Sequence, residues 1–586
     1  MILLRYILLY FIILLGSIFI ADKLKDKVQN TIAVYLMSSI CCLYIFGLLN
    51  LLNFGILLTS MCSAILGMIT ILKYIKDKNV KQLRKIICTP GMIFFTLIFL
   101  IFIITTLKRT ITHWDQYSYW SYAAKDMYYS GKINIQNSIG IQYPPMPAIL
   151  QVYFMKIIGM YSQGIEIFTT WILGFSLLIP LFNKTNNKKI TNFAIGIIII
   201  CIPAIFSMLI FYESAYPDAL LGLLIGYILK VYFFESNEKI KNITLPLAML
   251  VVTIMKPTGF VIAGIMTITF FIYEIIKNKI KFTQLIKNKT IKKIIIYTMI
   301  IVLTYISYNT FFKIFNNSIE QQNSKESNIS YIISNIFTTT LGTPQDDYSA
   351  AESNGNLLDK LQNTTEIYTP VYISALGVIC VYIIVSIFIY KYSNNNENIS
   401  KKDVKYIYIS IFIGLAIYIL FLQIAYITKF STKEMINHDG FERYIGTYLL
   451  GILYLTTNIV LEKIKNKHLE NNLPYVILAA VIFTITPMHS IANATITSGI
   501  YNIDNQSYLS KSYESAEYIK QRVDENNNVL GICQKSELRL ENLIIRYYMY
   551  PINYKIMDKI DQSKGTFDEI IKNYNYIYIV YSDSYL

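Results

Sequence analysis

The sequence predicts an all-α polytopic membrane protein that carries a small α/β appendage at its C-terminus. Of its 586 residues, 54% are hydrophobic and only 15% are charged, whereas soluble domains carry about 25% charged residues. After position 490 the chain turns polar and shows short alternating patterns, which predict the appendage. A chain this apolar has more nonpolar surface than one core can bury, which excludes an ordinary cytosolic enzyme and a disordered protein.

The apolar segments set the expected number of helices. A bilayer core requires about 20 apolar residues per helix, and the chain offers about 12 to 14 such segments. Residues 1–21 are interpreted as a retained first span, because their apolar run is long for a signal peptide. Segment 146–160 is short enough to be interfacial or re-entrant, and 244–256 is short for a crossing. The predicted spans are 1–20, 31–50, 52–72, 91–107, 163–182, 191–212, 217–234, 244–256, 257–276, 294–312, 370–390, 405–427, 443–461 and 473–490.

Basic residues alternate between successive loops. The loops at 22–30, 73–88, 183–190, 235–243, 277–293, 391–405 and 462–472 hold 28 of the 52 Lys and Arg residues. The loops between them at 108–145, 313–369 and 428–443 hold 10. Because basic loops stay cytoplasmic, we expect the long loops, both termini and the appendage to face outside. The net charge of +15 is then a topology signal, and no nucleic-acid partner is expected.

Two domains follow from these patterns. Residues 1–490 form the expected transmembrane domain, with a first outer loop at 108–145 and a second large outer loop at 313–369. Residues 491–586 form an extracytoplasmic domain in which helix-like 513–526 and 541–550 alternate with strand-like 529–533 and 576–580. The seven cysteines include no CxxC pair and the four histidines are scattered, so neither a disulfide framework nor a zinc site is predicted.

The first outer loop concentrates aromatic and polar residues. Two of the three tryptophans in the chain, Trp114 and Trp120, flank Asp115. One interpretation is a general base or a metal-binding carboxylate between aromatic faces that stack on a sugar. The other is an interfacial aromatic belt with an incidental carboxylate. The loop ends at 143–147, where three prolines hold the chain extended, so we expect a rigid entry into the next segment.

Three further polar positions interrupt or begin apolar segments. The outer turn 212–218 contains Glu213 and Asp218, Lys256 interrupts a long apolar run, and Arg443 opens the span 443–461. Ionisable side chains at membrane depth are costly and typically mark functional sites. The two cations suit the phosphate of a lipid carrier. The alternatives are helix capping by Asp218, a snorkelling Lys256 and a helix-end anchor at Arg443.

In this order the motifs resemble those of the GT-C superfamily of polytopic glycosyltransferases. The similarity covers roughly 91–460 and is greatest to the bacterial branch related to protein O-mannosyltransferases and to the aminoarabinose transferase of lipid A. It implies that Asp115 is the catalytic carboxylate and that Pro144 and Pro145 form the loop-end motif. Lys256 and Arg443 fall where basic residues hold the donor phosphate. The chain departs from the family in its extra spans before the loop and in its single Asp115, where many members have an Asp-Glu pair.

The resemblance implies an inverting glycosyltransferase of a bacterial cytoplasmic membrane. It would move a sugar from a polyprenyl-phosphate donor to a hydroxyl of an extracytoplasmic glycan, lipid or protein, with Asp115 as the base and His113 orienting it. The alternatives are a flippase or transporter for lipid-linked glycans and a polysaccharide polymerase or ligase. The sequence requires no cofactor and leaves a divalent cation such as Mg²⁺ or Mn²⁺ open. The residues expected to bind substrate are Trp114, Tyr117, Trp120, Lys125, Tyr143, Glu213 and Asp218.

Overall fold

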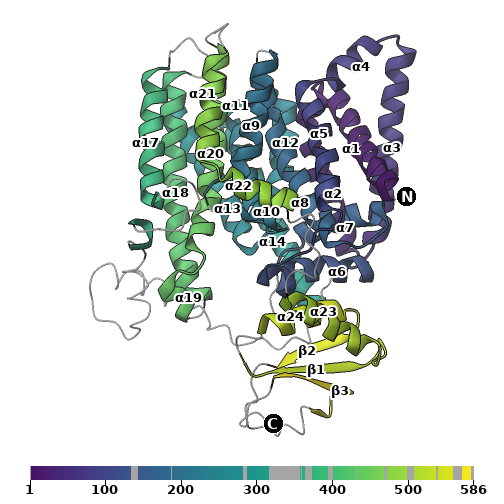
Figure 1. Ribbon diagram of the computed structural model, residues 1–586. Coiled ribbons are helices and arrows are strands. Elements are labelled where there is room, and N and C mark those ends of the chain that lie inside the picture. The colour runs from purple at the N-terminus through teal and green to yellow at the C-terminus, as the bar shows by residue number, and fades with distance from the viewer. Residues whose placement is uncertain are drawn as a thin grey trace.

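The protein is a bundle of helices with a small α/β unit at one end (Figure 1). The structure is a computed structural model. It describes residues 2–133, 143–185, 188–206, 208–280, 285, 287–315, 357, 359–362, 373–393, 400–430, 432–466, 472–497, 507–535, 539–557 and 571–581. Most of the predicted second outer loop, 313–369, lies outside these residues.

Eight of the described helices are long and apolar enough to cross a membrane, and the number rises to ten if two bent helix pairs each count as one span. The chain is therefore a multi-pass α-helical membrane protein. The number is below the predicted range because several predicted spans form shorter or broken helices. The eight are α1 (Ile2–Leu24), α2 (Val28–Leu48), α3 (Leu52–Lys76), α8 (Gln163–Leu178) with η2 (Ile179–Lys184), α13 (Pro257–Asn278), α14 (Lys289–Phe315), α18 (Lys401–Lys429) and α20 (Phe441–Asn466).

The predicted span 191–212 is not one helix. It divides into α9 (Lys189–Cys201), the 3-10 turn η3 (Ile202–Ala204) and the short α10 (Ile210–Glu213). Pro203 has no N–H to donate to the helix, and Phe206 adopts a left-handed backbone with φ of 60°. Average hydropathy does not register such a break, since nearly every residue around it is apolar.

Two further segments bend at a proline. Helices α4 (Val80–Ile87) and α5 (Pro90–Thr106) meet at 59°, and α21 (Leu473–Thr484) bends by 78° into α22 (Met488–Ala492), which follows Pro487. The short segment predicted at 244–256 is longer than expected, because Asn237 caps the start of α12 by accepting hydrogen bonds from two backbone N–H groups. The remaining helices of the bundle are α7 (Met146–Ile158), α11 (Asp218–Phe234), α12 (Glu238–Thr253) and α17 (Ala375–Lys391).

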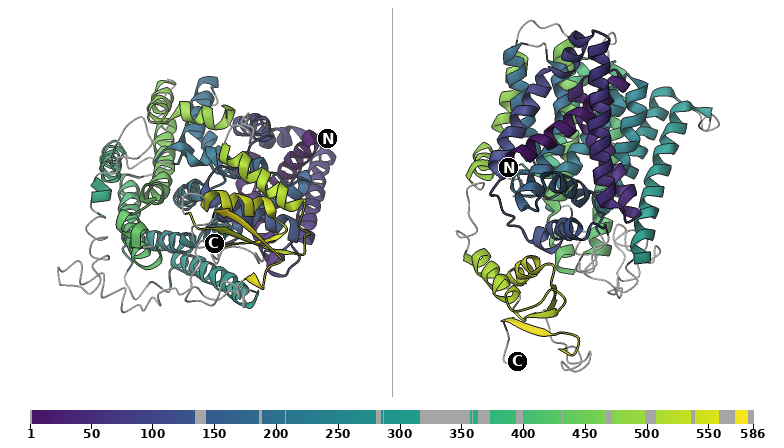
Figure 2. Two further views of the ribbon diagram at one scale, coloured as in Figure 1. Left: turned by 60° about the horizontal axis from the view of Figure 1, so that its bottom comes forward. Right: turned by 90° about the vertical axis from the view of Figure 1, so that its right-hand side faces the viewer.

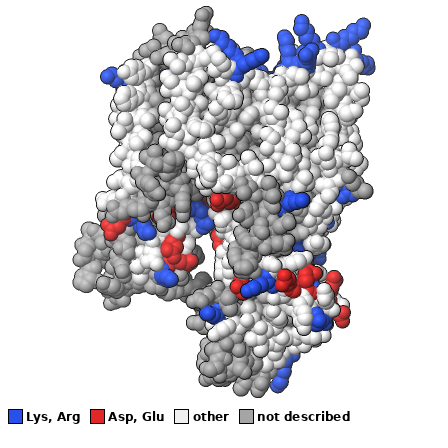
Figure 3. All heavy atoms as spheres, viewed as in Figure 1, with Lys and Arg blue, Asp and Glu red and all other residues white. Residues whose placement is uncertain are grey.

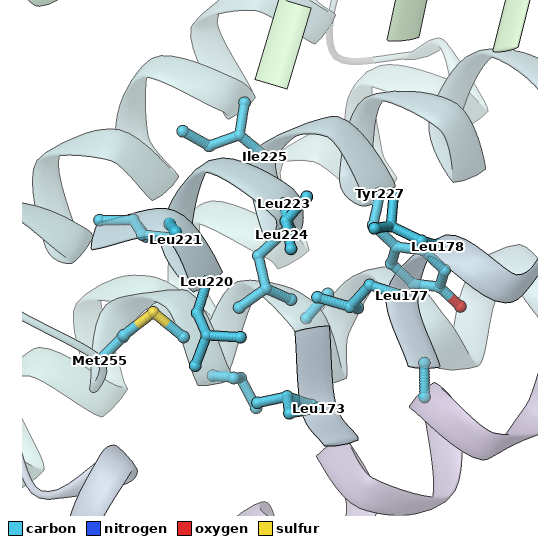
Figure 4. Close-up of a cluster of buried hydrophobic side chains, with 14 of the residues drawn as sticks. Leu173, Leu177, Leu178, Leu220, Leu221, Leu223, Leu224, Ile225, Tyr227 and Met255 are labelled. Atoms are coloured by element: carbon cyan, nitrogen blue, oxygen red, sulfur yellow. The ribbon is translucent and has the colours of Figure 1, made fainter. Parts of the chain in front are cut away.

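Helix α11 lies at the centre of the bundle and packs along α20. Nearly all of its side chains are buried, and its leucines meet those of α8 in a continuous apolar core (Figure 4). Gly222 permits the close approach to α20, since a Cβ there would lie 2.7 Å from the carbonyl oxygen of Thr447. This packing fixes the starts of α11 and α20 beside each other.

The loops that the charge pattern assigns to one side lie together at one end of the bundle. Lys73 lies 3.3 Å from Asp22, and Lys239 donates to the carbonyl of Lys23 at 2.6 Å. Figure 3 shows Lys and Arg side chains gathered along this rim. The alternation of loops in the sequence therefore corresponds to the two ends of the molecule. Further ion pairs at this end are Lys293–Glu238, Lys184–Glu462 and Lys277–Asp403.

The α/β unit lies at the opposite end (Figures 1 and 2). Its elements are α23 (Ser507–Lys520), β1 (Asn528–Cys533), α24 (Arg539–Met549), β2 (Asn553–Met557) and β3 (Tyr576–Tyr581). The three strands are parallel in the order β2-β1-β3. The central strand β1 is almost wholly buried, which explains its uninterrupted apolar sequence. The sequence patterns predict β1, β3 and both helices. They do not predict β2, whose five residues mix polar and apolar side chains.

Candidate functional site

Four charged residues from separate segments meet at the end of the bundle that faces the α/β unit. Asp115 stands directly before the π-helical turn η1 (Gln116–Trp120), and Asp218 is the first residue of α11. Lys256 adopts an extended conformation just before Pro257 starts α13, and Arg443 lies in the first turn of α20. We call these four residues the charge row.

The charge row alternates in sign. Lys256 Nζ lies 2.7 Å from Asp218 Oδ1, and the other Asp218 oxygen lies 3.9 Å from Arg443 Nε. Arg443 Nη1 lies 3.6 Å from Asp115 Oδ2. The exposed side-chain fraction is 10% for Lys256 and 2% for Asp218 at one end of the row, and 23% for Arg443 and 43% for Asp115 at the other. The row therefore leads from a buried ion pair to a carboxylate that solvent reaches.

The buried ion pair bears on two alternatives raised by the sequence. The Asp218 carboxylate makes its close contact with Lys256, and no hydrogen bond from a side chain caps the start of α11. The Lys256 ammonium lies inside the protein, 4.8 Å from the centre of the Tyr444 ring. It is therefore a partnered lysine rather than one that snorkels into lipid headgroups.

Arg443 keeps much of its hydrogen-bonding capacity. Its guanidinium lies over the rings of Tyr216 and Tyr444, at 5.1 and 5.3 Å from their centres. Its contacts with the two carboxylates are longer than hydrogen bonds, and within the described part of the chain its buried Nε makes none. A planar fork in this state is suited to a bidentate anion such as a phosphate.

Tyr216 supports the exposed end of the charge row. Its hydroxyl oxygen accepts a hydrogen bond from the backbone N–H of Asp115 at 3.2 Å. The His113 ring packs edge-on against it, with 5.7 Å between ring centres. The sequence singled out neither Tyr216 nor Tyr444, although each stands beside a residue that it did select. The sequence signal that could have identified them is their position. Tyr216 lies within the turn 212–218, and Tyr444 directly follows Arg443.

His113 faces Glu213, with 3.8 Å between Nε2 and Oε2. Burial lowers the pKa of His113, and Arg443 and Arg109 lower it further, although Asp115 opposes them. Burial also raises the pKa of Glu213, against the influence of Arg109. Both shifts favour the neutral forms of the two groups, so they weaken any ion pair between His113 and Glu213. The charge of Asp115 acts on the His113 imidazole. The structure describes no hydrogen bond between these two side chains.

The aromatic residues of the loop divide into two groups. Tyr143 belongs to the site, because the charges of Asp115, Asp218 and Arg443 act on its hydroxyl, whose pKa burial raises to about 12. Trp120 is buried behind it and stacks on its ring at 5.0 Å. Trp114, next to Asp115, is exposed.

Two predicted substrate-binding residues lie elsewhere. Tyr117 is fully buried, donates to the carbonyl of Ile111 at 2.6 Å and packs edge-on against Tyr547 of the α/β unit. Lys125 donates to the Tyr547 carbonyl at 2.7 Å. The structure therefore directs both side chains toward the C-terminal unit and does not join them to the charge row.

The described residues contain no group of three or more His, Cys, Asp or Glu side chains that could hold a metal ion. A comparison with known protein families finds no match, and a comparison with curated proteins finds no relative. The fold and the site define a multi-pass α-helical membrane protein with a solvent-reached row of paired charges at one end of its bundle.

Proposed function

We propose that the protein is an inverting membrane glycosyltransferase that uses a polyprenyl-phosphate sugar as donor. The observation that carries the proposal is the position of Arg443, an under-bonded guanidinium between the exposed Asp115 and the buried Asp218. A base and an anion-binding fork stand side by side where a lipid headgroup meets water.

The reaction divides between these two side chains. Asp115 accepts the proton of the acceptor hydroxyl while that oxygen bonds to the anomeric carbon of the donor. The bond between the anomeric carbon and the phosphate oxygen breaks on the opposite face, and its electron pair leaves with the lipid phosphate. Arg443 stabilises the charge that develops there, in a partly dehydrated setting that strengthens the interaction.

Lys256 takes a different role from the one expected of it. Its ammonium is already engaged by Asp218 at 2.7 Å, so it is less available than Arg443 to a phosphate. We assign it to holding Asp218, which in turn faces Arg443. The phosphate-binding role then rests on Arg443, and the buried pair behind it fixes its position.

The proposed orientation places the charge row on the outside of a bacterial cytoplasmic membrane. It is supported by the gathering of the basic loops at the other end of the bundle. A transporter would instead place its charges near mid-membrane with access from both sides. The charge row lies at the helix ends, which favours an enzyme.

The test uses the purified protein in vesicles that contain a labelled polyprenyl-phosphate sugar, with a crude extracytoplasmic glycan fraction as acceptor. We expect release of free polyprenyl phosphate and transfer of the label. Replacing Asp115 by Asn keeps the shape and removes the base, so turnover should fall by about 10²–10⁴. Asp77→Asn, an exposed carboxylate at the other end of the bundle, is the control.

Three results would overturn the proposal. Near-normal transfer by Asp115→Asn would remove Asp115 from the chemistry. Movement of the donor between leaflets without release of lipid phosphate would establish a flippase. Transfer that proceeds only from a donor carrying a whole glycan chain would instead assign a polymerase or ligase.

A further inference from the structure

The C-terminal unit makes specific contacts with the segment that carries Asp115. Helix α24 lies against η1, and Figure 1 shows it close to α6 (Ser121–Ser130). Arg546 Nη2 donates to the carbonyl of Ser118 at 2.8 Å, and Tyr550 donates to Asp126 Oδ1 at 2.9 Å. In the reverse direction, Lys125 of α6 donates to the Tyr547 carbonyl at 2.7 Å. We call this set of contacts the clamp.

The clamp encloses a small shared core. Tyr117 and Tyr122 of the loop are buried in one apolar cluster with Leu543, Ile544 and Tyr547 of α24. All five side chains are almost fully buried. Because residues from both partners contribute to the same cluster, separation of the unit would expose apolar surface from each. The unit is therefore docked on the loop rather than tethered beside it.

Arg546 is the most informative member of the clamp. Only 4% of its surface is exposed, and its guanidinium stacks on the Tyr122 ring at 4.6 Å. The described residues place no carboxylate in an ion pair with it. Burying a cation without a counter-charge is costly. Arg546 offsets part of this cost through its hydrogen bond to the Ser118 carbonyl and its stacking on Tyr122, so its buried charge is tied to these two groups.

The partner of Arg546 indicates its role. Ser118 lies in the middle of η1, three residues after Asp115. A π-helical turn is rare and is frequently found at functional sites. A charge-assisted hydrogen bond to a carbonyl of this turn stabilises it. The conformation of η1 then fixes the direction in which Asp115, just before it, points toward Arg443.

We propose that the C-terminal α/β unit holds the Asp115 segment in its working conformation, with Arg546 as the positioning residue. The catalytic consequence of this inference rests on the proposed function, but the conformational part does not. Arg546 touches neither the charge row nor, on this account, the substrate. Its effect reaches Asp115 through the Ser118 carbonyl and the η1 turn.

The experiment measures hydrogen exchange of residues 116–130 in the full-length protein in lipid nanodiscs. Arg546→Ala should raise exchange there by about tenfold, the effect of losing one charge-assisted hydrogen bond. Exchange of β1 in the same sample shows whether the unit stays folded. Arg522→Ala is the matched control, since Arg522 stacks on Tyr518 within the unit and lies outside the clamp.

A turnover measurement separates positioning from mere packing. Arg546→Ala should lower kcat by about 10²-fold, the cost of a displacement of about 1 Å in a reacting group, with little change in KM for the donor. Arg546→Lys should restore part of kcat, because it keeps a cationic donor. Equal loss with Lys and Ala, or a change in KM alone, would overturn the positioning role.

The outcomes remain distinct from those of the proposed function. If Arg546→Ala leaves exchange of 116–130 unchanged, the clamp is refuted whatever the activity. If exchange rises but Asp115→Asn remains active, the proposed function fails and the clamp stands. If Arg546→Ala unfolds the unit, the deciding variant is Tyr550→Phe, which removes only the hydroxyl that donates to Asp126. Unchanged exchange of residues 121–130 in that variant would refute the clamp.

Discussion

Arg443 and Asp115 approach to 3.6 Å although 328 positions separate them in the chain. The contact is an ion pair that lacks hydrogen-bond geometry, with the guanidinium held over two tyrosine rings. Arg443 is thus placed by stacking and by the charges on either side of it. Its Nη2 donates one long hydrogen bond, to the Tyr444 hydroxyl at 3.4 Å, and its buried Nε makes none among the described residues. An incoming anion can bind the guanidinium without first breaking a strong bond.

The planar fork of Arg443 leads to the first prediction. Arg443→Lys should lower kcat/KM for the lipid-phosphate donor by about 10²-fold, because a lysine offers a point charge without the bidentate geometry or the stacking. The measurement is steady-state release of polyprenyl phosphate in vesicles. Lys433→Ala, in α19 (Thr432–Asn437) nearby, is the control. A lysine variant with unimpaired donor use would show that the fork is unnecessary.

The buried pair of Asp218 and Lys256 leads to the second prediction. Asp218→Asn leaves Lys256 as a buried charge without its close partner and should destabilise the fold by about 3–5 kcal/mol. Lys256→Met leaves Asp218 only the longer contact with Arg443 at 3.9 Å, so it should also destabilise the fold, but by less. The double variant removes both charges and should recover most of that loss. Thermal unfolding in detergent, followed for all three variants, measures the coupling between the two positions.

Activity should not recover with stability in the double variant. Asp218 also faces Arg443, at 3.9 Å, so its removal leaves the guanidinium paired only with Asp115. We expect the double variant to fold but to turn over at least about tenfold more slowly than the wild type. A double variant that regains both stability and turnover would confine the pair to a structural role.

Part of this architecture could be predicted from the sequence for a physical reason. Long apolar runs with no internal proline, such as the one that forms α18, can only bury their backbone polar groups as helices. The number of membrane crossings between them then places the charged helix ends on the same side of the membrane. We could therefore expect Asp115, Asp218, Lys256 and Arg443 to meet. Their order along the row could not, because it depends on how closely α11 and α20 pack.

The differences between expectation and structure also have a physical cause. The span expected at 191–212 breaks at a proline and at a left-handed Phe206, neither of which changes the average hydropathy. The direction of the Tyr117 and Lys125 side chains depends on the docking of α24, more than 400 residues later in the chain. No local pattern around position 120 carries that information.

The two titratable groups of the clamp, Lys125 and Asp126, have displaced pKa values. Burial, helped by the charge of Lys520, lowers the pKa of Lys125 to about 7, against the opposing charges of Glu166 and Glu517. Its ammonium also lies 4.5–5.9 Å from four tyrosine ring centres, those of Tyr161, Tyr547, Tyr548 and Tyr550. Burial raises the pKa of Asp126 to about 6, although the hydrogen bond from the Tyr550 hydroxyl opposes the shift.

These shifts predict that the clamp is weakest between about pH 6 and pH 7. When the clamp opens, both groups regain their ordinary pKa values of 10.5 and 3.8. The closed state binds fewer protons at Lys125, so closing strengthens as the pH rises from 7 toward 10.5. It binds more protons at Asp126, so closing also strengthens as the pH falls from 6 toward 3.8. The measurement is hydrogen exchange of 116–130 at about pH 5, about pH 6.5 and about pH 8.5, corrected for the intrinsic exchange rate. Asp126→Asn should abolish the gain at low pH and keep the gain at high pH. Equal protection of the wild type at all three values would contradict the prediction.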